Sequence, residues 1–420
     1  MSVEGWKTGT LGKLCKIEIG GTPMRDNPEY WDSQKETDNL WVSIRDMNQR
    51  VINDTAEYIT NIGVKNSNAK LQHEGTILLS FKLTIGRVAF AGKQLYTNEA
   101  IAALQTEQLT HNFLYYGLQQ WNLLQDVDQA IKGATLNKTK LNKIEFQYPV
   151  SLQEQTQIAT ILSTIDRAIE QTEALIAKQQ RIKTGLMQDL LTKGIDENGN
   201  IRSEETHEFK DSPLGRIPVE WEVVTTGQVT KSLVPGRDKP DLDGGGVPWI
   251  TIPDIEGMYL DLPKSGLSLS LNAIKVANAR LMPKGTVLMS CVGEFGIATI
   301  TECDAVANQQ LHGFICDQSI LPEWLIAQIN ASGNRIDNMA TQTTIKYLNK
   351  NGCESILITL PSLKEQVKII SILDNINDLF EKQKKSLNKL RSLKTGLMQD
   401  LLTGKVRVTE LIKERETDNL

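Results

Sequence analysis

Two short segments contain acidic and basic side chains in patterns that resemble catalytic or phosphate-binding motifs. Glu208 and Lys210 form the Glu-x-Lys half of a nuclease motif, but no Pro-Asp pair precedes them at a useful distance. Asp241 and Asp243 precede Gly244–Gly246, a composition that fits an acidic or phosphate-binding loop. A flexible turn explains the same residues more simply, because glycine and aspartate are common in turns. Neither segment therefore predicts a catalytic site.

A third segment offers a nucleophile without a base. Ser290 and Cys291 are adjacent, but no histidine stands near them in the sequence to activate either side chain, so a buried thiol in a strand is the better interpretation. The chain also has no Gly-Lys-Ser/Thr, no Asn/Asp-Pro-Pro-Tyr and no Gly-x-Ser-x-Gly. These absences argue against an ATP-driven motor, an adenine-amino methyltransferase and an α/β-hydrolase. We expect a chain that is not itself an enzyme.

Metal-binding patterns are also missing. The four histidines are scattered, and the five cysteines contain no Cys-x-x-Cys pair. The sequence therefore predicts no metal site and favours a reduced, cytosolic protein. The segment MSVEGWKTGT has no apolar run, and no stretch approaches about 18 apolar residues, so we expect neither a secretory signal nor a membrane span.

Charge is unevenly distributed along the 420 residues. The formal net charge of −5 argues weakly against a nucleic-acid partner. Residues 194–211, however, hold six acidic and only two basic residues. This polar segment is predicted to be an exposed connector. The other segments remain free to carry local basic faces.

The elements around these segments repeat. KTGLMQDLLT occupies Lys183–Thr192 and returns unchanged at Lys394–Thr403. Extending the alignment to Ser151–Thr192 and Ser362–Thr403 gives 20 identities in 42 positions, and both copies begin Ser-Leu-x-Glu-Gln. An internal repeat of this kind predicts a duplicated structural unit.

Both repeated segments carry apolar residues at alternating spacings of four and three, the pattern of a coiled-coil seam. The seam positions are Ile158, Leu162, Ile165, Ile169, Thr172, Ile176 and Gln179 in the first copy, and Ile369, Leu373, Ile376, Phe380, Gln383, Leu387 and Leu390 in the second. We predict two helices of roughly 50 Å that end at the glycines 194 and 404. Mutual packing is favoured over two independent surface helices, and polar seam residues could fix the register.

One glycine lies inside each predicted helix, although glycine costs about 1 kcal/mol there relative to alanine. Gly185 and Gly396 occupy the same place in the two copies. Their retention predicts the close approach of another backbone, either of the other helix or of a partner protein.

Each helix follows a globular block of about 150 residues with short apolar runs. We refer to residues 1–150 as block 1 and to residues 212–361 as block 2. Both contain a Trp-led run, at Trp41 and Trp249, and a run that opens on Gly-Thr, at Gly75 and Gly285. These runs predict buried strands within an α+β fold. Over Gly75–Leu104 and Gly285–Phe314 only 6 of 30 positions are identical. The blocks are therefore predicted to share a framework but to make different contacts with other molecules.

The order block, helix, block, helix resembles the specificity (S) subunit of type I restriction–modification systems. The doubled helix and the segment from His207 to Trp221 carry the resemblance, which covers nearly the whole chain. It implies two target recognition domains (1–150 and 212–361), a central helix (151–193), a connector (194–211) and a C-terminal helix with a tail (362–420). It also implies an antiparallel coiled coil with pseudo-two-fold symmetry.

The resemblance further implies function and partners. Each block would recognise one half of a split, asymmetric target in double-stranded DNA, with half-sites about one DNA turn, or about 34–36 Å, apart. Two methyltransferase subunits would dock on the helices and bring S-adenosylmethionine. Motor–nuclease restriction subunits would bring ATP and Mg chemistry, so this chain would hold no cofactor.

Loop residues are the candidates for DNA contact, since arginine and glutamine can bond guanine and adenine edges bidentately. In block 1 they are Thr22, Arg25, Arg45, Lys82, Thr84, Arg87, Lys138 and Lys140. In block 2 they are Arg237, Lys239, Gln309, Gln310, Thr343, Thr344 and Lys346. The candidates for partner docking are Gly185, Leu186, Met187, Leu190, Gly396, Leu397, Met398 and Leu401.

Two alternatives remain open at this point. The chain could serve as the specificity module of another DNA-methylation or defence assembly. It could also be a coiled-coil scaffold whose blocks bind protein, in which case assembly would be insensitive to salt and independent of DNA.

Overall fold

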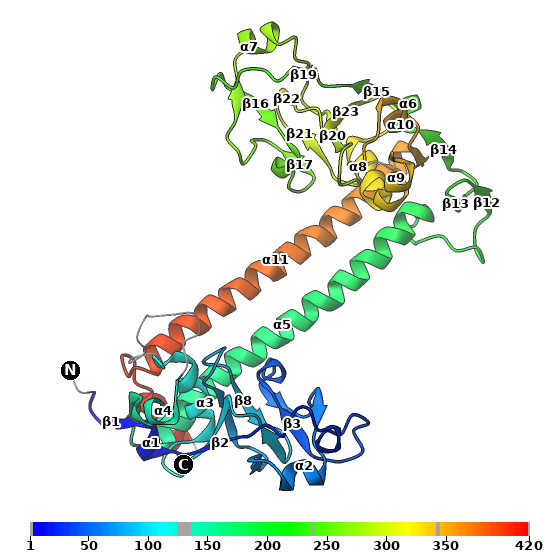
Figure 1. Cartoon of the computed structure of the whole chain (residues 1–420). Coiled ribbons are helices and arrows are strands. Elements are labelled where there is room, and N and C mark those ends of the chain that lie inside the picture. Colours follow the sequence, from blue (N-terminus) through cyan, green and yellow to red (C-terminus); the bar gives the residue numbers. More distant parts are fainter. Residues whose placement is uncertain (1–2, 124–135, 237, 342–344, 419–420) are drawn as a thin grey trace. The chain divides into compact units, whose positions relative to one another are not determined.

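The computed structural model describes residues 3–123, 136–236, 238–341 and 345–418 (Figure 1). The chain forms two compact units. Unit 1 comprises Met1–Ala174 and Lys385–Leu420, and unit 2 comprises Leu175–Lys384. Each long helix therefore contributes its two ends to different units.

Block 1 folds around a five-stranded sheet with the order β2-β10-β7-β8-β4. All four side chains of β7 (Ile77–Ser80) are buried, as expected for a central strand. A four-stranded sheet, β5-β3-β9-β6, and a two-stranded sheet, β1-β11, complete the block. The other strands are β1 (Trp6–Thr10), β2 (Lys16–Ile19), β3 (Leu40–Val42), β4 (Val51–Ile52), β5 (Glu57–Tyr58), β6 (Leu71–Gln72), β8 (Val88–Ala91), β9 (Leu95–Thr97), β10 (Ile101–Gln105) and β11 (Glu145–Pro149).

Short helices cover the strands of block 1. The helix α3 (His111–Gln120) packs on β7 and β8 through an apolar face that includes Phe113, Leu114 and Tyr116. The helix α4 (Lys138–Lys143) packs against α1 (Leu11–Leu14). The remaining helical elements of unit 1 are α2 (Asn61–Lys65), α12 (Thr409–Asp418) and the 3-10 turns η1 (Pro28–Tyr30) and η2 (Ile44–Asp46).

Block 2 repeats this plan. Its sheets have the orders β15-β23-β20-β21-β17, β18-β16-β22-β19 and β14-β24, which match those of block 1 strand by strand. The strands are β14 (Glu222–Thr225), β15 (Thr230–Leu233), β16 (Val247–Ile250), β17 (Tyr259–Leu260), β18 (Ser268–Leu269), β19 (Leu281–Met282), β20 (Val287–Ser290), β21 (Ala298–Thr301), β22 (Ala305–Ala307), β23 (Leu311–Cys316) and β24 (Leu357–Leu360). The helical elements are α6 (Thr226–Val229), η3 (Ile252–Asp254), α7 (Leu271–Val276), α8 (Pro322–Ala331), α9 (Gly333–Met339) and α10 (Lys350–Glu354). The predicted strands that begin near Trp41, Gly75, Trp249 and Gly285 are confirmed.

The two predicted long helices are present as α5 (Leu152–Thr192) and α11 (Leu363–Leu401). Ser151 and Ser362 accept a hydrogen bond from the backbone N–H three residues later, as N-cap residues do. Past the other ends, Gly194 and Gly404 have positive φ values of 64° and 71°. Glycine adopts this left-handed conformation without steric cost, which suits the end of a helix.

The hydrophobic core of each unit combines a block with one end of each long helix. In unit 1, Ile158 of α5 and Leu401 of α11 are buried with block 1. In unit 2, Leu190 of α5 and Ile369 of α11 are buried with block 2. The start of each helix thus packs with the block that precedes it, and its end packs with the other block.

Within unit 1, ion pairs join the two helices. Arg391 of α11 pairs with Glu173 of α5 at 2.6 Å, and Lys394 pairs with Asp166 at 2.7 Å. The partner in α5 moves back along the chain as the residue number in α11 rises, so the two segments run in opposite directions.

Of the two alternatives for the interior glycines, close approach of the other helix is wrong, and approach of a partner protein stays a prediction. An added Cβ on Gly185 or Gly396 would meet no atom within 4 Å in the described part of the chain, so neither glycine is needed for approach of the other helix. Thr172 donates to the carbonyl of Ala168 in its own helix, and Gln179 Oε1 lacks a hydrogen-bond partner among the described residues. Neither Thr172 nor the side-chain oxygen of Gln179 therefore supports the prediction that polar seam residues fix the register through an interhelical hydrogen bond.

The prediction of an exposed connector is also wrong in part. Ile195 and Arg202 are buried, and Ile195 belongs to the core of unit 2. The end of the segment forms a hairpin of β12 (Phe209–Ser212) and β13 (Gly215–Pro218). Arg202 is buried because it pairs with a carboxylate described below, which composition alone does not reveal. Across the described ranges, no helix is long and apolar enough to cross a membrane.

Candidate nucleic-acid interface

Two arginines of block 1 share one carboxylate. Arg25, in the loop after β2, contacts both carboxylate oxygens of Glu57 at 2.5 and 3.3 Å. Arg45, in η2, contacts Glu57 Oε2 at 2.8 Å. The side chain of Arg25 is 50% exposed and that of Arg45 is 58% exposed. Glu57 thus holds two guanidinium groups in fixed positions that face solvent.

Aromatic rings fix the plane of the Arg25 guanidinium. Its carbon atom lies 4.0 Å from the ring centroid of Trp31 and 4.7 Å from that of Trp41. The two rings meet edge to face, and Trp41 donates its indole N–H to the carbonyl of Gly21. A stacked, planar guanidinium is suited to bidentate recognition of a flat hydrogen-bonding edge.

The β7–β8 hairpin joins the same region. Arg87 donates from Nη1 to the carbonyl of Ile44 at 3.0 Å and to Asn48 Oδ1 at 2.7 Å. These acceptors flank Arg45, so the hairpin is tied to the η2 loop. Lys82 and Thr84 lie at the tip of this hairpin, and Thr84 is exposed.

We call Arg25, Arg45, Lys82 and Arg87 the basic loop cluster. The structure links Arg25, Arg45 and Arg87, which the sequence predicted as separate DNA-contact candidates, through Glu57 and the η2 loop, and Lys82 belongs to the same hairpin as Arg87. Thr22 lies in the same loop as Arg25 and donates to Glu99. Sequence analysis missed Glu57 and Asn48, which hold the arginines, because no sequence pattern links them to residues more than 30 positions away.

The two other candidates of block 1 lie on a helix. Lys138 and Lys140 are the first and third residues of α4. The chain approaches α4 beside the base of the hairpin, since Leu136 donates its N–H to the carbonyl of Phe81. Lys138 is exposed and Lys140 is half-buried.

Block 2 presents different chemistry on the same framework. Counted from the equivalent elements, the positions of Arg45, Lys82 and Arg87 are taken by Pro253, Val292 and Ile297. The loop that carries Arg25 is longer than the loop between β15 and β16, which contains Lys239.

Amide side chains gather instead in the loop before β23. Gln309 donates to the carbonyl of Gly236 at 3.1 Å, and Asn308 donates to Gln310 Oε1 at 3.0 Å. Gln309 and Gln310 are exposed, whereas Lys346 is half-buried and pairs with Asp337 at 2.6 Å. The candidates Arg237, Thr343 and Thr344 lie outside the described residues.

The predicted docking residues divide into two groups. Leu190, Met398 and Leu401 are buried in the cores of the units. Leu186, Met187 and Leu397 are half-buried and pack against the same cores. Gly185 is exposed and Gly396 is half-buried. Within the chain, the repeated decapeptide therefore packs the end of each long helix into a hydrophobic core.

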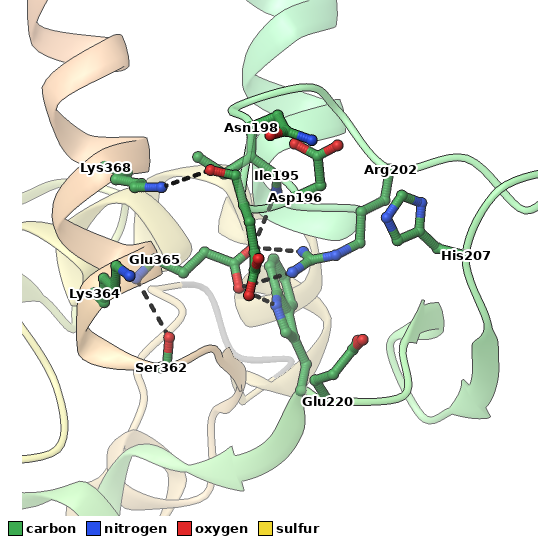
Figure 2. A pocket seen from close by; sticks show the side chains of 12 residues that line it. Ile195, Asp196, Asn198, Arg202, His207, Glu220, Ser362, Lys364, Glu365 and Lys368 are labelled. Carbon is green, nitrogen blue, oxygen red and sulfur yellow. Dashed lines mark hydrogen bonds and ion pairs between the residues drawn. The ribbon is translucent and has the colours of Figure 1, made fainter.

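A glutamate near the start of each long helix, buried in α5 and half-buried in α11, organises a contact that the sequence did not predict. Glu365, near the start of α11, accepts from the indole N–H of Trp221 at 3.1 Å, from Arg202 at 2.5 Å and from the backbone N–H of Ile195 at 2.9 Å. Figure 2 shows Glu365 and Arg202 pointing toward each other at the wall of a polar cavity of about 510 Å³.

Unit 1 contains the same arrangement. Glu154, near the start of α5, accepts from the indole N–H of Trp6 at 3.4 Å and from Arg407 at 2.6 and 2.9 Å. In both units the tryptophan opens a block, the glutamate opens the following helix, and the arginine follows the end of the other helix. The only sequence signal was the shared Ser-Leu-x-Glu-Gln, and nothing in it showed that its glutamate pairs with a tryptophan and an arginine.

Known proteins are similar to this chain over much of its length. The profile of the type I restriction modification DNA specificity domain matches residues 3–179 and 218–392. The MjaX specificity subunit of Methanocaldococcus jannaschii is 28% identical over 286 residues, which cover 67% of this chain and 63% of that protein. The MjaVIII specificity subunit of the same organism is 25% identical over 368 residues, which cover 81% of each chain.

Solved structures show the same fold at lower sequence identity. A chain from a study of complex assembly and conformational transition of the type I R-M system has a TM-score of 0.63 and 16% identity, with 97% of this chain and 100% of that chain covered. The S subunit from M. genitalium has a TM-score of 0.54 and 15% identity, with 96% of each chain covered. With two copies of the specificity domain along most of its length, the chain belongs to the type I restriction modification DNA specificity domain family.

Proposed function

We propose that this chain is the sequence-recognition subunit of a type I restriction–modification assembly. In this proposal block 1 binds one half of a split DNA target and block 2 binds the other half. The main support is that both blocks share one strand order, while their equivalent loops carry different chemistry. A duplicated framework with unlike loops suits two unlike half-sites, and hence an asymmetric target.

Different contacts are proposed for the two blocks. The basic loop cluster suits phosphates and guanine edges, since guanidinium groups bond both bidentately. Gln309 and Gln310 suit adenine edges, because an amide both donates and accepts. Block 1 would therefore contribute more of the salt-dependent affinity, and block 2 more of the hydrogen-bond recognition.

The long helices would pair as an antiparallel coiled coil and hold the blocks apart. The opposite directions of the helix segments in unit 1 and the buried or half-buried seam positions support this proposal. The bases between the half-sites would then remain uncontacted, and the length of the helices would set their number.

Methyltransferase subunits would dock near the repeated decapeptides. Ile182 and Leu393, which immediately precede the two copies, are apolar residues with 55% and 49% exposure. Three residues later, Gly185 and Gly396 leave open space beside the backbone. Two matching apolar sites on one chain suit two copies of one partner. Catalysis, with S-adenosylmethionine, ATP and Mg, would belong to the partner subunits.

The decisive experiment maps methylation. The chain is co-expressed with the methyltransferase of its own system in an unmethylated host, and N6-methyladenine is read across the genome. We expect one split, asymmetric motif that disappears when this chain is omitted. Replacing residues 1–150 with the first block of a related subunit should change only one half of that motif.

Methylation that is independent of this chain would contradict the proposal. A binding assay then separates DNA recognition from the scaffold alternative. Specific DNA binding should weaken steeply as salt rises, whereas association through protein contacts alone should change little.

A further inference from the structure

Leu83, at the tip of the β7–β8 hairpin, combines two unfavourable features. Its backbone is left-handed, with a φ of 62°, and its apolar side chain is 82% exposed. Side chains with a Cβ rarely adopt this backbone conformation, because the Cβ atom crowds the following carbonyl oxygen. An exposed leucine at a loop tip also contributes no hydrophobic free energy to folding. The residue therefore fits neither a folding role nor an ordinary turn.

The other left-handed residues have evident reasons for their conformation. Among the described residues that are not glycine, only Lys35 and Asn278 share it. Lys35 is held by Asp54 and by the carbonyl of Thr55. Asparagine tolerates the left-handed region because its short polar side chain bonds locally. Leu83 has neither kind of explanation.

Block 2 shows the simpler solution at the same place. The third residue after β20 is Gly293, with a φ of 81°, and the third residue after β7 is Leu83. Glycine satisfies this turn without strain. A leucine at this position is therefore a departure from the easier choice, and such departures gather at functional sites.

The hairpin holds Leu83 firmly. The N–H of Gly86 donates to the Ser80 carbonyl, and that of Arg87 donates to Ser80 Oγ, both at 3.0 Å. Ser80 Oγ in turn donates to the carbonyl of Thr84 at 2.5 Å. The bonds of Arg87 to the η2 loop fix the hairpin to the rest of the basic loop cluster. Leu83 is thus an apolar tip on a braced loop, and the basic residues Lys82 and Arg87 belong to the same hairpin.

We propose that Leu83 is a specificity-determining residue that contacts the C5 methyl group of a thymine in the half-site bound by block 1. This inference rests on the proposed function. The thymine methyl is the one apolar feature that a base pair presents in the major groove, and apolar side chains recognise it. Lys82 and Arg87 in the same hairpin favour DNA over a protein partner, because basic side chains can neutralise the phosphates that flank the groove.

The test removes the methyl group and the side chain separately. Binding of the complete methyltransferase complex is measured on target duplexes in which each thymine of the block 1 half-site is replaced by deoxyuridine. This change deletes only the methyl group and preserves base pairing. For the natural chain we expect one position where uracil weakens binding about fourfold, the factor that corresponds to one buried carbon.

Two variants complete the cycle. Leu83→Gly should bind the thymine target about fourfold more weakly and lose the difference between thymine and uracil at that position. It should melt at the same or a higher temperature than the natural chain, because glycine relieves the backbone strain. Leu83→Asn tolerates the same turn, keeps a similar size and should show the same loss. Uracil in the block 2 half-site serves as the matched control and should affect all three chains equally.

Several results would overturn the inference. They are an unchanged thymine preference in both variants, a block 1 half-site that contains no thymine on either strand, or weaker association with the methyltransferase in place of weaker DNA binding. Failure of the proposed function is distinct, since the natural complex would then show no sequence preference at all.

Discussion

Glu57 places one negative charge at a surface proposed to bind DNA, between Arg25 and Arg45. Its carboxylate opposes phosphates, but it also fixes two guanidinium groups. Glu57→Gln should therefore raise affinity for random DNA slightly and lower the ratio of specific to random affinity about tenfold, because the two arginines proposed to contact base edges would lose their fixed geometry. Fluorescence anisotropy with target and scrambled duplexes measures both quantities.

The exposed Glu107 supplies the control for this change. Glu107→Gln removes the same charge from block 1 but lies in the loop between β10 and α3, away from the arginines in the chain. It should leave the specificity ratio unchanged. Equal effects of the two variants would indicate that only net charge matters and that the arginines need no carboxylate to position them.

His312 makes the stability of unit 2 depend on pH. Its ring lies buried beside Phe314, with Nε2 3.0 Å from Ser232 Oγ, and burial lowers the pKa of the imidazole to about 4. The unfolded chain, with an ordinary pKa of 6.5, binds the proton first as pH falls. The free energy of unfolding should therefore be unaffected by His312 above pH 6.5. It should decrease by up to about 3 kcal/mol between pH 6.5 and 4.

Chemical denaturation at a series of pH values measures this dependence. His312→Gln keeps a polar group near Ser232 but cannot take up the proton, so the difference between the two chains should shrink as the pH falls. A constant difference across pH 4–7 would show that the imidazole does not remain neutral in the folded protein.

At the scale of elements, the two interior glycines separate folding from docking. An added methyl group at Gly185 or Gly396 meets no atom of the described chain. Gly185→Ala and Gly396→Ala should therefore each stabilise the free chain by about 0.5–1 kcal/mol through helix propensity. If a partner backbone approaches there, the same substitutions should weaken its binding.

Denaturation of the free chain and titration with the methyltransferase give the two readouts. A stabilised chain with unchanged partner affinity would remove the docking role from both glycines. Ala159→Gly, in the same helix but buried in the core of unit 1, is the reverse control and should destabilise the chain.

The sequence contained enough information to place the helices and the main strands. Seam spacing located α5 and α11, and apolar runs after Gly75 and Gly285 located β7 and β20, because these signals are local. The partners of buried charges were not predictable in this way. Arg202 and Glu365 are 163 positions apart, and Arg25 and Glu57 are 32 apart. Such contacts follow from tertiary packing, which one sequence does not encode as a pattern.

Charge along the helices explains their direction. In α5 four of the five acidic residues, Glu154, Asp166, Glu170 and Glu173, lie in the first part, and in α11 basic residues from Lys382 to Lys394 lie in the last part. Within unit 1 these two parts meet, as the pairs of Asp166 with Lys394 and Glu173 with Arg391 show. Parallel pairing would set the acidic starts of both helices against each other.

At the scale of the whole molecule, the duplication gives each unit its own core and its own glutamate bonded to a tryptophan and an arginine. Glu154 ties together Trp6, the start of α5 and the chain after α11. Glu365 ties together Trp221, the start of α11 and the chain after α5. Each cluster connects both long helices to one block, so the two units have matched but separate glutamate clusters.

The two glutamate clusters predict how the chain unfolds. Because each unit has a separate core, heating should produce two transitions, and Glu365→Gln should lower only the one that belongs to unit 2. Loss of a buried ion pair costs about 3–5 kcal/mol, which corresponds to a shift of roughly 10 °C in a unit of this size. Glu154→Gln is the matched variant for unit 1 and should shift the other transition by less, because its partner Arg407 is more exposed than Arg202.

Differential scanning calorimetry detects the transitions, and hydrogen exchange assigns them to units. A single transition that moves equally with either substitution would mean that the long helices couple the units into one cooperative structure. Separate shifts would mean that each block folds with its own pair of helix ends. A block could then change its loops, and hence its proposed half-site, without disturbing the stability of the other block.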